Sequence, residues 1–242
     1  MLTLAETFAG IGGWSEAARM AGGIRPVWVS EIHKYKNLVY ELRHPGVPNL
    51  GDIRNITSAP YADIFTVSFP CTDISVMGKG AGIEGQNSRL WFEALRLIGS
   101  SRPKYVVIEN SPILTIRGFD RILSGLAGLG YDAEWTHLQG TQFGVQQRRK
   151  RLYCVAYAAK NGQLRQYPES IFRRIQTGGG RNSNTLILPG WRERRDIPEP
   201  RTVRSAHDVP DLIHRLECIG DAIMPLIGMY VLECVKIHHA EK

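Results

Sequence analysis

The chain has 242 residues, 43% of them apolar, with 30 Lys and Arg against 23 Asp and Glu. This length and composition support one sizeable hydrophobic core and exclude collagen-like, low-complexity and wholly disordered chains. The formal charge of +7 favours a polyanionic partner.

The sequence does not predict a membrane or secreted protein. No run reaches the ~18 apolar residues that a membrane-spanning helix needs. The first residues carry Glu6 and no basic leader, which is not typical of a signal peptide. Four cysteines stand far apart without a CxxC pair: Cys71, Cys154, Cys218 and Cys234. That spacing argues against a disulfide framework and a zinc ribbon, and favours a reducing compartment.

The first 156 residues alternate short apolar runs with amphipathic stretches. The apolar runs predict strands over Leu2–Thr7, Pro26–Ser30, Ile64–Ser68, Tyr105–Ile108 and Leu152–Ala156. The amphipathic stretches predict helices over Trp14–Ala21, Lys36–Leu42, Leu90–Ile98 and Asp120–Leu129. This alternation predicts an α/β domain with a mostly parallel sheet and helices on both faces, and ligands bind such sheets beyond the carboxyl ends of the strands.

The composition changes from about Tyr157. Residues 157–205 contain ten Lys and Arg but four Asp and Glu, together with four prolines and a triple glycine. We interpret this stretch as a small basic insert. An ordered pattern returns after Asp208 and ends in an apolar helix, roughly Pro225–Ile237. The chain is therefore expected to comprise a domain over 1–156, the insert over 157–205, and a segment over 206–242 that returns to the first domain.

Glycines and acids at the strand ends predict a nucleoside site. The first strand runs into Phe8-Ala9-Gly10-Ile11-Gly12-Gly13, and glycines in such a turn let a ligand approach the backbone. Glu31 ends the second strand at the spacing of an acid that binds ribose hydroxyls, and Asp52 in the next loop can hold an adenine amino group. The turn lacks the GxGxxG spacing that binds a pyrophosphate, which disfavours NAD. The structural alternative is a tight turn of any α/β protein.

Two further strand ends carry candidate catalytic groups. Cys71, in Ser68-Phe69-Pro70-Cys71, follows the third apolar run, where its thiolate can act as a nucleophile. The alternative is a buried structural cysteine. Glu109 ends the next strand, and adjacent parallel strands lie about 5 Å apart, so both side chains can reach one substrate.

A basic run precedes the last strand of the first domain. Gln147, Arg149 and Arg151 alternate along it and therefore share one face, which suits phosphate or carbonyl binding. The alternative is a solvated basic surface.

In order and spacing, these blocks resemble the C5-cytosine-specific DNA methyltransferases that use S-adenosylmethionine. The turn over 8–13 resembles their first cofactor motif, Pro70-Cys71 their catalytic Pro-Cys, and Glu109-Asn110 their Glu-Asn motif. Gln147-x-Arg149-x-Arg151 resembles the Gln-x-Arg-x-Arg motif, and Gly220-Asp221-Ala222-Ile223 the closing Gly-Asn-Ala-Val block. The resemblance covers nearly the whole chain apart from the insert. It implies a Rossmann-like methyltransferase fold, with the insert as a short target-recognition region.

The resemblance also implies roles for single residues. Cys71 attacks C6 of a flipped cytosine, Glu109 donates to N3, Arg151 contacts O2, and Arg149 supports the active-site loop. S-adenosylmethionine is the implied cofactor, with contacts from Phe8, Ala9, Gly10, Ile11, Gly12, Gly13, Glu31, Ile32, Asp52, Ile53, Pro70, Leu90, Asp221 and Ala222. Double-stranded DNA is the implied partner, with contacts from Ser75, Lys79, Arg89, Gln147, Arg192, Arg194 and Arg195.

Four positions depart from the family pattern. Thr72 replaces the Gln after Pro-Cys, Ser111 the Val after Glu-Asn, Gln146 the Pro before Gln147, and Asp221 the closing Asn. None of these changes removes a catalytic group. Because the recognition region is short, we expect a short or lax target sequence.

Other functions fit the sequence less well. A tRNA cytosine methyltransferase has the same scaffold and remains the nearest alternative. A noncatalytic DNA-binding relative is disfavoured by the presence of Cys71 and Glu109, and a dinucleotide oxidoreductase by the missing GxGxxG. The scattered cysteines and histidines lack metal-ligand spacing, so no metal is expected. We expect a monomer in the cytoplasm of a prokaryotic or phage-infected cell, associated with the nucleoid and acting in restriction-modification.

Overall fold

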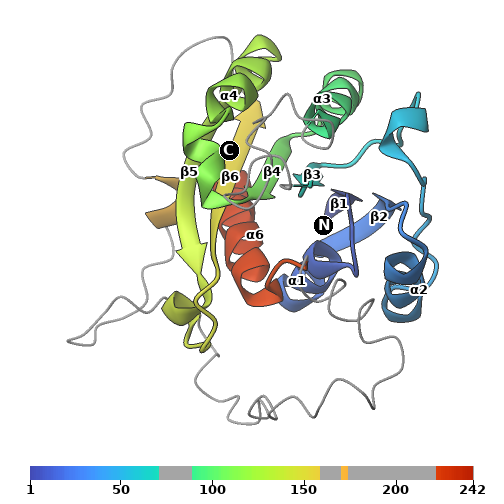
Figure 1. Ribbon diagram of the computed structural model, residues 1–242, viewed down its shortest axis with the longest axis horizontal. Coiled ribbons are helices and arrows are strands. Elements are labelled where there is room, and N and C mark those ends of the chain that lie inside the picture. Colours follow the sequence, from blue (N-terminus) through green and yellow to red (C-terminus); the bar gives the residue numbers. More distant parts are fainter. Residues whose placement is uncertain (71–88, 159–169, 174–221, 242) are drawn as a thin grey trace.

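The computed structural model describes residues 1–70, 89–158, 170–173 and 222–241 (Figure 1). Within these residues six strands form one sheet in the order β2-β1-β3-β4-β6-β5. The strands are β1 Leu2–Thr7, β2 Ile24–Ser30, β3 Ile64–Val67, β4 Tyr105–Asn110, β5 Tyr131–Gln139 and β6 Lys150–Ala158. Strands β1 to β4 are parallel, whereas β6 is antiparallel to both β4 and β5. The predicted α/β class and mostly parallel sheet are confirmed.

Helices cover both faces of this sheet (Figure 1). The helices are α1 Gly13–Ala21, α2 Lys34–Arg43, α3 Leu90–Ser101, α4 Phe119–Gly128 and α6 Pro225–Ala240. Short 3-10 segments are η1 Ile53–Asn55, η3 Pro112–Ile116, η4 Gly140–Phe143 and η5 Ile171–Arg173. None of the helices in the described ranges is long and apolar enough to cross a membrane.

The central strand β4 is covered by helices on both of its faces. All six of its residues are buried, because successive side chains point to opposite faces and each face is covered. Val106 and Ile108 belong to the core cluster that contains residues of α3 and α4. Tyr105 and Val107 belong to the cluster that contains residues of α1 and α6.

Helix α6 packs closely on α1 through small residues. A Cβ atom added to Gly228 would lie 2.8 Å from the Cβ of Ala17, and one added to Gly13 would lie 2.5 Å from Cγ1 of Ile223. Glycine at both positions therefore lets the C-terminal segment lie against the start of α1. This packing brings Ala222, just before α6, to the carboxyl end of the sheet.

Each predicted strand and helix is present, with ends that differ by a few residues, but the sequence did not predict β5. This strand lies at the edge of the sheet, and its Trp135 is 48% exposed. Its apolar residues alternate with polar ones such as Asp132 and Glu134, so it lacks the continuous apolar run of a buried parallel strand. Most of the insert over 157–205, and residues 206–221, lie outside the described residues.

Candidate active site

A cleft of about 450 Å³ opens at the carboxyl ends of β1, β2, β3 and β4, where parallel sheets commonly bind ligands. Most of the cofactor residues predicted from the sequence line it: Phe8, Ala9, Gly10, Gly13, Glu31, Ile32, Asp52, Ile53, Pro70, Leu90 and Ala222. The predicted catalytic residues Glu109, Arg149 and Arg151 line the same cleft. Residues from eight different segments of the chain thus surround one space.

Other predicted residues lie elsewhere. Ile11 and Gly12 are not among the residues that line the cleft, and Arg89 is exposed immediately before α3. Gln147 lines a small adjoining recess together with Glu109 and both arginines of its motif. Several predicted residues lie outside the described part of the chain: Cys71, Ser75, Lys79, Arg192, Arg194, Arg195 and Asp221. In the residues that are described, no three His, Cys, Asp or Glu gather as a metal site would require.

The turn between β1 and α1 forms the floor of the cleft. Phe8, Gly10 and Gly12 all have positive φ, at 57°, 57° and 84°. A Cβ added to Gly10 would meet no atom within 4 Å, so this glycine leaves open space in the cleft. A Cβ on Gly12 would lie 2.8 Å from the ring of Tyr40 and 2.9 Å from that of His44. Gly12 is therefore required for packing behind the turn rather than for contact with a ligand.

A buried acid below this turn was not singled out from the sequence. The Glu6 carboxylate accepts hydrogen bonds from the Trp14 amide (3.0 Å) and from the amide and hydroxyl of Ser15 (3.0 and 2.6 Å). It thus caps the start of α1, whose first amides have no partner within the helix. Burial raises the pKa of Glu6 to about 7, although these hydrogen bonds act in the opposite direction. A single acid in an otherwise apolar strand, directly before a glycine turn, was the available signal.

Glu31 stands where β2 ends and faces the turn. Its Oε2 accepts a hydrogen bond from the Gly10 amide at 2.7 Å, and its Oε1 accepts one from the His33 amide at 2.7 Å. Because each bond uses one lone pair of a carboxylate oxygen, both oxygens keep capacity to accept from a ligand hydroxyl. The orientation of the carboxylate is therefore set by backbone atoms.

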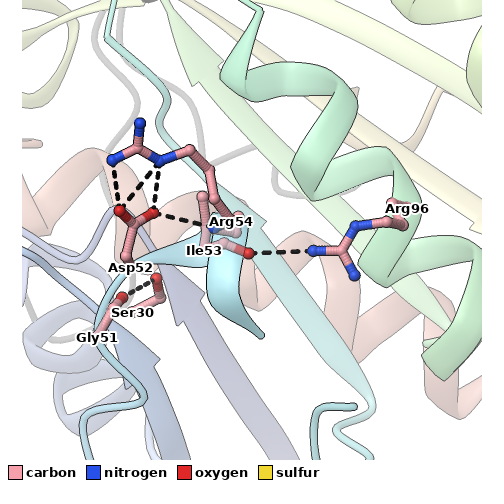
Figure 2. Close-up of polar contacts among 6 residues, drawn as sticks. All are labelled: Ser30, Gly51, Asp52, Ile53, Arg54 and Arg96. Atoms are coloured by element: carbon pink, nitrogen blue, oxygen red, sulfur yellow. Dashed lines mark hydrogen bonds and ion pairs between the residues drawn. The ribbon is translucent and has the colours of Figure 1, made fainter. Parts of the chain in front are cut away.

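Asp52 lies on the neighbouring loop and is paired with Arg54, a partner the sequence did not predict (Figure 2). The Arg54 Nε lies 3.0 Å from each carboxylate oxygen, and its backbone amide donates to Oδ1 at 3.0 Å. These contacts hold the pKa of Asp52 below its usual value, chiefly through the guanidinium hydrogen bond. Asp52 thus lines the cleft as an ionised acceptor that already has a cationic partner.

The side of the cleft that holds the predicted catalytic residues is formed by the ends of β4 and β6. Glu109 is 6% exposed, and its Oε1 lies 3.3 Å from Nε of Arg151 on the antiparallel neighbour strand. Arg149 donates through Nη1 to the carbonyl of Ala222 at 2.9 Å. Its buried Nε has no hydrogen-bond partner among the described residues. Arg149 therefore links the start of β6 to the segment that leads into α6.

Asn110 links the ends of the two central strands. Its Nδ2 donates to the carbonyl of Phe69 at 3.0 Å, and its Oδ1 accepts from the Ser111 amide at 2.8 Å. The bond to Phe69 fixes the backbone immediately before Pro70, which lines the cleft. Phe69 and Pro70, the last described residues of this segment, therefore lie beside the end of β4, and Cys71 lies outside the described residues.

Comparison with known proteins adds family evidence to this geometry. A family model described as C-5 cytosine-specific DNA methylase matches residues 2–208. The type II methyltransferase M.DsaV of Dactylococcopsis salina is 31% identical over 170 residues, which are 67% of this chain and 47% of that protein. M.Bsp6I of a Bacillus species is 33% identical over 167 residues, which are 65% and 52% of the two chains. The chain spans about half the length of the curated relatives that it matches.

The fold also has solved counterparts. The crystal structure of S. pombe Dnmt2 methyltransferase superimposes with a TM-score of 0.60 and 22% identity, covering 74% of this chain and 57% of that one. At this identity the likeness concerns the fold alone.

Proposed function

Because the chain belongs to the C-5 cytosine-specific DNA methylase family, we propose that it transfers a methyl group from S-adenosylmethionine to C5 of a cytosine in double-stranded DNA. The observation that carries this proposal is the single cleft that Glu31 and Asp52 share with Glu109, Arg149 and Arg151. A nucleoside-binding side and a charged catalytic side then meet at one place.

The residues of the cleft fit the proposed methyl donor. Gly10 leaves room for a ligand, Phe8 offers an aromatic ring, and the carboxylates of Glu31 and Asp52 can accept from ribose hydroxyls and an adenine amino group. A volume of about 450 Å³ lies within the usual size of small-molecule sites. When bound, S-adenosylmethionine supplies an electrophilic methyl group on a sulfonium.

The catalytic step that we propose uses Cys71 as the nucleophile. Its thiolate adds to C6 of the cytosine, which raises the electron density at C5. The bound methyl donor would supply the methyl group to the C5 electron pair. Water would then take the C5 proton, the electrons of that C–H bond would re-form the C5–C6 double bond, and Cys71 would leave C6 as the thiolate.

Glu109 and Arg151 would act on the edge of the same ring. In its acid form Glu109 donates to N3, which stabilises the negative charge that develops after addition at C6. Arg151 donates to O2, and the 3.3 Å contact between the two side chains supports their action on one base. Arg149 is proposed to support the loop around the base, since it already holds the carbonyl of Ala222.

Double-stranded DNA is the proposed partner, and its target base must leave the stack to reach the cleft. We propose that Ser75, Lys79, Arg89 and Gln147 contact this DNA, and that the basic insert with Arg192, Arg194 and Arg195 reads it. We further propose that the protein acts as a monomer, with the DNA of a bacterial or phage-infected cell as its substrate.

The test is mass spectrometry of nucleosides. Unmethylated duplex DNA and bulk tRNA are incubated separately with the protein and deuterium-labelled S-adenosylmethionine. We expect labelled 5-methylcytosine in the DNA and none in the tRNA. Label found in tRNA alone would mean that the substrate is RNA and not DNA. No label in either substrate, with binding of S-adenosylhomocysteine retained, would favour a noncatalytic DNA-binding relative.

A further inference from the structure

The wall that carries Asp52 and Ile53 has little regular structure of its own. Between α2 and β3 its only helical element is η1, a single 3-10 turn of three residues. A short run of backbone hydrogen bonds holds the loop to the end of β2: Val29 donates to Pro48 (2.9 Å), and Leu50 donates to Val29 (2.7 Å). Beyond Leu50, other groups must fix the position of the two residues that line the cleft.

The side chain of Asn49 links the two acids of the cofactor side. Its Oδ1 accepts from the backbone amides of Glu31 and Gly51, both at 3.0 Å. Its Nδ2 donates to the carbonyl of Glu31 (2.9 Å) and to Oδ1 of Asn37 (2.8 Å). One amide thus uses both of its donors and two acceptor sites, and it spans from Glu31 to the residue before Asp52.

Ser30 holds the carbonyl of Gly51, whose amide is already bound by Asn49. Its hydroxyl donates to the carbonyl of Gly51 at 2.7 Å (Figure 2). Gly51, which has a φ of 75°, is therefore held at both its N–H and its C=O. The backbone that enters Asp52 has a fixed direction.

Arg96 of α3 holds the same wall from the opposite side. Its Nη2 donates to the carbonyl of Ile53 at 3.1 Å (Figure 2). Its Nη1 donates to the carbonyl of Ile56 at 2.8 Å. Its Nε donates to Glu93 at 2.9 Å. The planar guanidinium fork suits two nearby carbonyl acceptors, which a lysine ammonium cannot match. The Ile53 carbonyl also accepts from the Ile56 amide at 3.3 Å within the turn, so Arg96 adds a second donor there and holds the Ile56 carbonyl as well.

We infer that Asn49 and Arg96 are positioning residues of the cofactor site, which set the distance between the Glu31 and Asp52 acceptors without touching the ligand. Neither is among the described residues that line the cleft. The inference rests on the proposed function, because it assigns the ribose and adenine of the methyl donor to these two acids. A ligand that binds two acceptors at once requires a fixed spacing between them.

The experiment uses the full chain and conservative substitutions. Asn49→Asp keeps an acceptor for the two amides but places an oxygen against the Glu31 carbonyl. Arg96→Gln removes the fork, and Arg96→Lys keeps the charge. The controls are Asn37→Ala, which removes one outer bond to Asn49, and Glu93→Gln, which removes the ion pair of Arg96 but not its bonds to the carbonyls. Calorimetry measures the Kd for S-adenosylhomocysteine, and steady-state assays give the KM for S-adenosylmethionine and the kcat on DNA.

We expect Asn49→Asp and Arg96→Gln each to raise the Kd and this KM about tenfold, with the loss in KM rather than kcat. Arg96→Lys should recover part of the affinity, and both controls should stay within about twofold of the wild type. A fall in melting temperature with the Kd unchanged would overturn the inference, because both residues would then be merely structural. A fall in kcat at saturating cofactor as large as the rise in KM would also overturn the inference. If the wild type binds no S-adenosylhomocysteine, the proposed function fails and the inference fails with it.

Discussion

The two sides of the cleft are built differently. On the cofactor side, Glu31 is oriented by backbone amides, and Asn49 ties it to the Asp52 loop, all within the first 56 residues. On the catalytic side, Glu109 contacts an arginine of an antiparallel strand, and Arg149 holds a carbonyl 73 residues further along the chain. The two acids of the cofactor side are held mainly by groups nearby in the sequence, with an added contact from Arg96 of α3, whereas the catalytic side is assembled from distant segments.

This difference predicts which measurement responds to a substitution. Groups on the cofactor side should change ligand affinity and the stability of the β1–α1 unit. Groups on the catalytic side should change the rate while cofactor affinity is preserved, because, as proposed, they act on the cytosine rather than on the methyl donor. The following variants test this separation.

The largest effect is expected at the proposed nucleophile. Cys71→Ala should lower methyl transfer by about 10⁴-fold or more, because the proposed bond to C6 requires its thiolate. The Kd for S-adenosylhomocysteine should stay within about twofold, because, as proposed, Cys71 acts on the cytosine and not on the methyl donor. Radiolabelled methyl transfer and calorimetry measure the two quantities.

Cys154 offers the matched control. Burial raises the pKa of its thiol to about 12, so it cannot supply a thiolate at neutral pH. Cys154→Ala should therefore retain turnover. Turnover that survived in Cys71→Ala would remove the covalent mechanism.

The sequence alone predicted the buried strands and the residues at their ends, but not the contacts made by exposed arginines. Runs such as Tyr105–Ile108 predicted buried parallel strands because a strand covered on both faces is apolar throughout. The sequence singled out Phe8–Gly13, Glu31 and Glu109 because each lies at or beyond the end of a predicted strand. The pairing of Arg54 with Asp52 and the bonds of Arg96 to η1 were not found, since exposed arginines carry no signal of their partners. Such contacts depend on tertiary packing, which spacing along the chain does not encode.

The next largest effect concerns Glu6, whose pKa of about 7 exceeds its ordinary value of 4.5. Between these values the folded protein binds a proton that the unfolded chain has released. The contribution of Glu6 to stability is therefore fully present below about pH 4.5 and is lost as the pH rises to 7, a change of roughly 3 kcal/mol. Glu6→Gln should remove this slope.

Chemical unfolding of the wild type and of Glu6→Gln at pH 5 and pH 7.5 measures the difference. At pH 5 the protonated carboxyl of the wild type and the amide of Glu6→Gln each offer one carbonyl acceptor, so the two stabilities should be similar. At pH 7.5 the wild type should have lost roughly 3 kcal/mol of stability relative to the variant. A gap that stayed constant with pH would contradict the assigned pKa.

A smaller effect, a loss of cofactor affinity, is expected from Glu31→Gln. This variant keeps the shape of the side chain but removes the charge that accepts from Gly10 and, as proposed, from the ribose hydroxyls. Hydrogen bonds to charged groups contribute about 2 kcal/mol, so the cofactor Kd should rise about thirtyfold. Glu16→Gln, which breaks an exposed pair with Arg19 on α1, is the control. A fall in kcat at saturating cofactor would show that the two sides are coupled.

The smallest effect, a slight loss of cofactor affinity, is expected from Arg54→Gln. The side chain of Arg54 is 62% exposed, and exposed ion pairs contribute about 1 kcal/mol or less. The cofactor Kd should therefore rise by less than about fivefold at low salt. The difference in Kd between the variant and the wild type should vanish at ~0.5 M salt, where exposed charges are screened. Titrations of both proteins with S-adenosylhomocysteine at two salt concentrations measure this. If the loss instead equalled that of Glu31→Gln and persisted in salt, the cofactor side would depend on a side-chain ion pair, and its backbone bonds would not suffice to place Asp52.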